Sequence, residues 1–126
     1  MKELTEALAR ATSSLSHISA TASEKTGPQG GLCISLVGHL DSDAASALMD
    51  PMVEVIEKWE GEKRIFVDLS HLEYIASLGI GMLTMAAVAA RKRGIELSLL
   101  APQPSVLHVL ELLGIPTYIP IFQKEP

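Results

Sequence analysis

Cysteine, aromatic residues and clustered positive charge are all scarce in this 126-residue sequence. The single cysteine, Cys33, cannot form an internal disulfide, and its apolar neighbours predict a reduced, buried thiol. Aromatic residues make up only 4% of the chain, which leaves an aliphatic core and few rings for stacking on bases. The formal net charge of −5 disfavours contact with phosphate backbones, which require clustered Lys and Arg. We therefore expect no direct binding of nucleic acid.

Long apolar runs are also missing. The first six residues, MKELTE, lack the apolar stretch of a signal peptide. Further along, charged residues, Gly or Pro interrupt every apolar segment well before it reaches the length of a membrane span. These features predict a cytoplasmic protein with no direct membrane insertion.

Motifs for catalysis, metal binding or cofactor binding are absent as well. A nucleophile elbow needs glycine two residues before and two residues after its serine, and although Gly79 follows Ser77 at that spacing, Ile75 occupies the earlier position. A phosphate-binding loop ends in Gly-Lys-Ser/Thr, which the sequence does not contain. The histidines lie on separate predicted elements with no paired spacing, which disfavours a zinc site. They are His17, His39, His71 and His108. We expect no enzyme activity, no metal and no cofactor.

The length and the 48% content of hydrophobic residues fit one domain with an ordinary core. Residues 2–11 favour a helix but are followed by Ser and Thr, which predicts a weakly held N-terminal arm over residues 1–14 and a folded domain over residues 15–126. Periodicity and turn residues then predict strands and helices in the order β-β-α-β-α-β-α, with an optional last strand. The strands are expected at 15–23, 32–37, 64–69, 95–100 and 118–122, and the helices at 44–59, 79–93 and 104–113.

This order predicts an α/β fold with a mixed sheet, on which the helices bury their apolar stripes. The first two strands are expected to form a hairpin across a turn at residues 26–31, and the strand at 64–69 is expected to be central. Pro51 lies inside the first predicted helix of the domain, so we expect a kink or a restart there. Asp41, Ser42 or Asp43 could cap that helix.

Ser77 stands where a predicted strand gives way to a helix, and two glycines, Gly79 and Gly81, follow it. Small residues at this point would let a partner approach the backbone. The N-terminus of a helix stabilises an anion, so a phosphate on Ser77 would be held locally and would add about −1.5 to −2 charges to the surface. The alternative interpretation is that Ser77 only caps the helix.

The segment from Val67 to Gly81, VDLSHLEYIASLGIG, resembles the core motif of STAS domains, the sulfate transporter and anti-sigma factor antagonist family. Residues 38–41, GHLD, resemble the Gly-x-Leu-Asp turn before the first helix of that family. Residues 106–114, VLHVLELLG, resemble its third helix and the glycine that ends it. The resemblance covers residues 15–122 in order, and it implies the STAS fold, a mixed sheet with helices packed on it.

In bacterial anti-sigma factor antagonists of this family, a partner kinase that also sequesters a sigma factor phosphorylates a serine in an Asp-Ser-x-Gly turn. The resemblance places Ser77 at that position and implies a non-enzymatic switch, in which only the dephosphorylated form binds the kinase/anti-sigma factor. The binding surface would include the exposed face of the following helix and two short segments. These are Asp41 and Ser42, and Ala76, Ser77, Leu78, Gly79, Ile80 and Gly81.

Two positions depart from the family pattern. Ala76 stands where aspartate is usual, and Leu78 stands where a small hydroxyl residue is common. This favours an alternative in which the chain is a constitutive adaptor that binds the ATPase of a phospholipid-transport ABC complex, or other STAS proteins in a stress-sensing assembly. The chain also stops near where many members continue into a last helix, which implies an apolar strip open to a partner or to a second copy in a homodimer.

Overall fold

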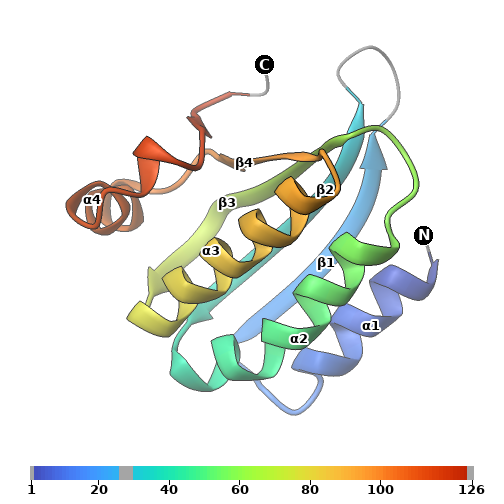
Figure 1. Cartoon of the computed structure of the whole chain (residues 1–126). Coiled ribbons are helices and arrows are strands. Elements are labelled where there is room, and N and C mark those ends of the chain that lie inside the picture. The colour runs from blue at the N-terminus through green and yellow to red at the C-terminus, as the bar shows by residue number, and fades with distance from the viewer. Residues whose placement is uncertain (1, 26–29, 125–126) are drawn as a thin grey trace.

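The computed structural model describes residues 2–25 and 30–124, which form a five-stranded sheet with four α-helices and one short 3₁₀-helix (Figure 1). The strands are β1 (Ile18–Lys25), β2 (Gly31–Leu40), β3 (Arg64–Ile75), β4 (Glu96–Leu100) and β5 (Ile121–Phe122). The helices are α1 (Lys2–Thr12), α2 (Ser42–Lys58), α3 (Ser77–Lys92) and α4 (Pro104–Leu112), and the 3₁₀-helix is Ile115–Thr117.

The strands lie in the order β1-β2-β3-β4-β5, so their spatial order is their order in the sequence. β1 pairs with β2 in the antiparallel direction, and the other three pairs are parallel. Parallel neighbours need a crossover, which α2, α3 and α4 supply in turn. The predicted mixed α/β fold, the hairpin and the central position of β3 are confirmed. The turn predicted at residues 26–31 lies mostly outside the described residues.

The helices form two layers on the sheet. Figure 1 shows α1, α2 and α3 on one face, and α4 on the other, where it contacts β3. The two faces of the sheet differ in burial, as the side chains of β2 show. Ile34 and Leu36 are fully buried in the main core, whereas Val37, on the opposite face, is 41% exposed. Cys33 is buried, as predicted, and this burial raises the pKa of its thiol.

The N-terminal helix is an integral part of the packing, which corrects the prediction of a weakly held arm. Leu8 has no exposed surface and belongs to the main core. Thr5 Oγ1 donates a hydrogen bond to the carbonyl oxygen of Ala22 in β1, at 3.1 Å. α1 contacts both β1 and α2. The predicted domain boundary after residue 14 stays a prediction, but the first helix contributes to the same core as the sheet.

Two further expectations differ from the structure. α2 continues through Pro51 as one helix, so the expected restart is wrong, while the expected kink stays a prediction. The fully buried Leu48 and Met52 anchor the helix on either side of the missing backbone hydrogen bond. β3 extends six residues beyond the predicted 64–69, to Ile75. Its polar residues suggested a turn, but β2 follows it through two register shifts, and the buried Leu72 keeps the strand on the core.

We expect Leu8→Ala to lower the free energy of unfolding by about 2–5 kcal/mol, because the substitution leaves a cavity in the core. Urea denaturation followed by circular dichroism measures the loss. Glu6→Ala, at an exposed position of the same helix, is the matched control and should leave the free energy nearly unchanged. Equal, small effects of the two substitutions would show that α1 does not share the core.

Candidate functional site

The carboxyl ends of β2 and β3 bring the predicted site segments together. Leu40 pairs with Ile75 at the end of this parallel ladder, and the backbone N–H of Ala76 donates to the carbonyl oxygen of Leu40 at 2.9 Å. The N-terminal ends of α2 and α3 therefore lie near each other, as Figure 1 shows. The predicted residues Asp41 and Ser42 lie on one side of this junction, and residues 76–81 lie on the other.

Asp41 organises the start of α2. It is the N-cap residue, and its Oδ1 accepts a hydrogen bond from the backbone N–H of Ala44 at 2.9 Å. Its Oδ2 lies 2.9 Å from Nε2 of His17, an atom that is shielded from solvent. The hydrogen bond from Ala44, followed by the nearby His17 side chain, holds the pKa of the Asp41 carboxyl below its usual value. Asp41 is thus an ionised group already engaged within the protein, and its first role is to fix the site.

Ser77 does not cap α3, so the interpretation of Ser77 as a simple cap is wrong. The N-cap residue is Ala76, which has an extended backbone with φ −87° and ψ 166° and has no polar side chain to accept a bond from the first turn. Ser77 is the first helical residue, and it is exposed. The helix begins without the side-chain oxygen that Asp41 gives to α2. An anion at this position would meet the positive end of the α3 dipole.

The two glycines after Ser77 have different surroundings. A Cβ added to the buried Gly79 would lie 2.9 Å from Cδ2 of Leu40 and 3.0 Å from Cγ1 of Ile75. Gly79 therefore lets α3 pack closely on the ends of β2 and β3. A Cβ added to Gly81 would meet no atom within 4 Å in the described structure. Of the two, Gly81 is the one that leaves space on the outer surface for a partner.

Sequence reasoning missed three residues beside the site. His17, His39 and Tyr74 line a shallow pocket of about 470 Å³ together with Asp41. The ring centroids of His39 and Tyr74 are 6.3 Å apart, and the backbone N–H of His39 donates to the carbonyl oxygen of His17 at 2.8 Å. These residues are far apart in the sequence, and only the pairing of β2 with its two neighbouring strands brings them together.

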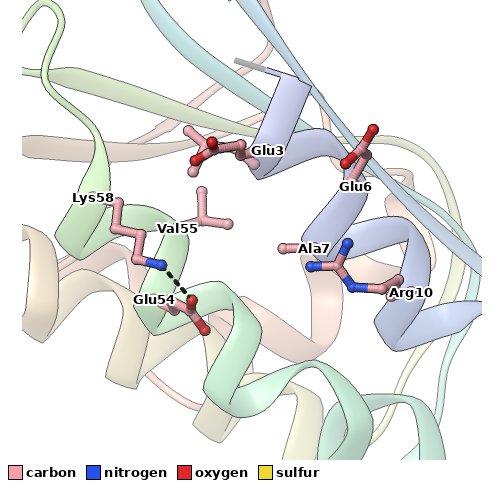
Figure 2. A pocket seen from close by; sticks show the side chains of 8 residues that line it. Glu3, Glu6, Ala7, Arg10, Glu54, Val55 and Lys58 are labelled. Carbon is pink, nitrogen blue, oxygen red and sulfur yellow. Dashed lines mark hydrogen bonds and ion pairs between the residues drawn. The ribbon is translucent and has the colours of Figure 1, made fainter.

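A second pocket, of about 220 Å³, lies between α1 and α2 (Figure 2). Nζ of Lys58 donates to Oε1 of Glu54 at 2.7 Å, and this pair lowers the pKa of Glu54 and raises the pKa of Lys58. Glu3, Glu6 and Arg10 surround the same space in Figure 2. This pocket is near the C-terminal end of α2, away from the cap at Asp41, and its charges are of both signs. It is not the predicted site.

Metal-binding clusters and membrane-spanning helices are not found in the part of the chain that the structure describes. Within residues 2–25 and 30–124, no group of three or more His, Cys, Asp or Glu side chains is arranged to hold a metal ion. No helix in the same ranges combines the length and the apolar character needed to cross a membrane.

The family model described as Mlab, STAS domain, matches residues 25–121. The chain therefore belongs to the STAS domain family. It is 32% identical over 92 residues to the "Putative anti-sigma factor antagonist BtrV" of Bordetella bronchiseptica, covering 73% of this chain and 78% of BtrV.

Solved structures show the same fold. An anti-sigma-factor antagonist (STAS) domain protein from Planctomyces limnophilus aligns with a TM-score of 0.70 and 14% identity, over 82% of this chain and 88% of that protein. The phosphorylated form of the Bacillus cell fate determinant SpoIIAA aligns with a TM-score of 0.58 and 18% identity, over 80% and 90% of the two chains.

We expect Gly79→Ala to destabilise the protein and Gly81→Ala not to destabilise it. The added methyl group at Gly79 meets Leu40 and Ile75, which should lower the free energy of unfolding by about 1–3 kcal/mol. The methyl group at Gly81 has open space and improves helix propensity, so that free energy should stay the same or rise by up to about 1 kcal/mol. Urea denaturation of both variants measures the difference, and equal losses would contradict the geometry.

We expect Asp41→Ala to lower the melting temperature at pH 7, because α2 loses its cap and His17 loses its partner. The folded protein lowers the pKa of Asp41 below its usual value of 3.8, so the stabilisation is present above pH 3.8 and is lost as the pH falls through the lowered pKa. The difference in melting temperature between Asp41→Ala and the wild type should therefore become smaller in acid. Ser42→Ala, at the exposed next position, is the control. A melting-temperature difference that is equally large in strong acid would show that the stabilisation does not come from the ionised Asp41 carboxyl.

Proposed function

We propose that this protein is a non-enzymatic anti-sigma factor antagonist of the bacterial cytoplasm that binds a serine kinase/anti-sigma factor and is switched by phosphorylation of Ser77. The observation that carries the proposal is the exposure of Ser77 as the first residue of α3, directly after Ala76, which cannot cap the helix. A kinase could reach this hydroxyl without unfolding the turn. Membership of the STAS family and the similarity to BtrV support the same role.

The proposed switch acts through charge at the junction of α2 and α3. A phosphate on Ser77 would add about −1.5 to −2 charges, held by the N–H groups at the start of α3. Leu78, which is 42% exposed, follows directly, so the same phosphate would stand beside an apolar contact point. Bringing a partner onto that point would then require desolvation of the phosphate. The unmodified form would bind the partner and the modified form would release it.

The absence of aspartate at position 76 favours a second candidate function. A constitutive STAS adaptor would use the same surface without phosphorylation, bound to the ATPase of a phospholipid-transport ABC complex or to other STAS proteins. Ala76 leaves the turn without the carboxylate that is usual in the switched antagonists. In this alternative, Ser77 would be a contact residue only.

Incubation with a purified anti-sigma factor kinase from the same organism and ATP tests the switch. We expect mass spectrometry to find one phosphate on Ser77, none on Ser77→Ala, and at least about tenfold weaker kinase binding by Ser77→Asp. Ser105→Ala, at an exposed serine of α4 on the other face of the sheet, is the matched control and should be phosphorylated normally. An unmodified Ser77, together with unaltered binding of Ser77→Asp, would refute the switch. Copurification with a transporter ATPase in place of the kinase would then favour the adaptor.

A further inference from the structure

The exposed face of α3 carries an apolar stripe that starts beside Ser77. Leu78, Met85 and Val88 are 42%, 51% and 40% exposed, and their spacing places them on one side of the helix. Met85 and Val88 also line a groove of about 280 Å³ between α3 and α2, together with Val53. The stripe therefore extends along α3 from the proposed phosphorylation site to the groove.

Gly81 interrupts this stripe, one turn after Leu78 and one turn before Met85. Glycine inside a helix lowers its stability, and no neighbour within 4 Å in the described structure would obstruct a Cβ at this position. The packing of the chain on itself thus gives no reason for glycine here, in contrast to Gly79, which contacts Leu40. A missing side chain between two protruding apolar ones forms a hole that a knob from another helix could enter.

The two ends of the stripe differ in the charge of the residues around them. At the C-terminal end of the stripe, two basic residues, Lys92 and Arg93, line the groove together with one acidic residue, Glu57. Asp43 and Glu73 are exposed at the other end, where α2 and α3 begin. An acidic partner segment would be attracted to the first end and repelled from the second.

We propose that this stripe is the docking site for an amphipathic helix of the partner, about 14 residues long, with acidic residues over Lys92 and one apolar side chain in the hole at Gly81. The inference rests on the proposed function and specifies the partner's chemistry. It also gives the switch its physical basis, because the end of the docked helix over Leu78 is apolar and lies beside Ser77. A phosphate there would have to be buried against an apolar surface.

Isothermal titration of the full-length protein with the purified anti-sigma factor kinase tests the docking site. We expect Gly81→Ala and Met85→Ser each to weaken binding by about tenfold or more, while Gly81→Ala keeps or raises the melting temperature. Lys92→Glu should weaken binding severalfold, with a smaller effect at high salt. The control is Leu112→Ser on α4, because Leu112 is 71% exposed but lies on the other side of the sheet, and it should bind like the wild type.

Kinase binding by Gly81→Ala and Met85→Ser that matches the wild type would overturn the inference and leave the proposed function standing. If those variants instead abolish self-association of the protein in analytical ultracentrifugation while kinase binding persists, a second copy occupies the stripe and the inference is again overturned. A wild-type protein that does not bind the kinase at all would refute the proposed function and the docking helix together. The two failures are therefore distinguishable.

Discussion

The arrangement of the site depends on the backbone hydrogen bond between Ala76 and Leu40, which joins the ends of two parallel strands. It fixes where β3 stops and, through the chain on either side, where α2 and α3 begin. Gly79 then allows α3 to settle on the side chain of Leu40. Asp41 follows Leu40 directly and anchors α2 by its cap. A displacement of this one pairing would move both helix starts, and the surface between them would no longer exist as a unit.

The order of elements and the strand-to-helix turn at Ser77 were predictable, because both depend on the local sequence. Apolar periodicity and the glycines that end helices are readable within a short window. The last part of β3 was missed for the opposite reason, since its polar residues resemble a turn and only the bulged pairing with β2 extends the strand. His17 was missed in the same way, because its contact with Asp41 joins residues that are 24 positions apart in the chain. The role of α1 also depends on a distant contact, since an isolated helix of this length is marginal in water and Leu8 gains its stability from the core.

Ala76 and Gly81 are two positions where the chain departs from the best local choice for a helix. Alanine at the N-cap leaves the first N–H groups of α3 without a side-chain acceptor, and glycine in the second turn weakens the helix. The described packing on the sheet does not require glycine at position 81, where an added Cβ would meet no atom within 4 Å. Residues that lower the stability of a helix in this way are expected at functional surfaces, where a partner needs to approach the protein closely. Both lie near the exposed face of α3 that begins at Ser77.

The uncapped start of α3 also bears on what a phosphate would do to the fold. A phosphoryl group on Ser77 would lie near the N–H groups that the Ala76 side chain cannot bond, and it would complement the positive end of the helix dipole. The modification would then stabilise the first turn of α3 while it made the neighbouring Leu78 unsuitable for an apolar contact. The modified and unmodified proteins would share one backbone, and they would differ in a single surface property. A switch built in this way needs no conformational change, because the partner distinguishes the two forms by charge alone.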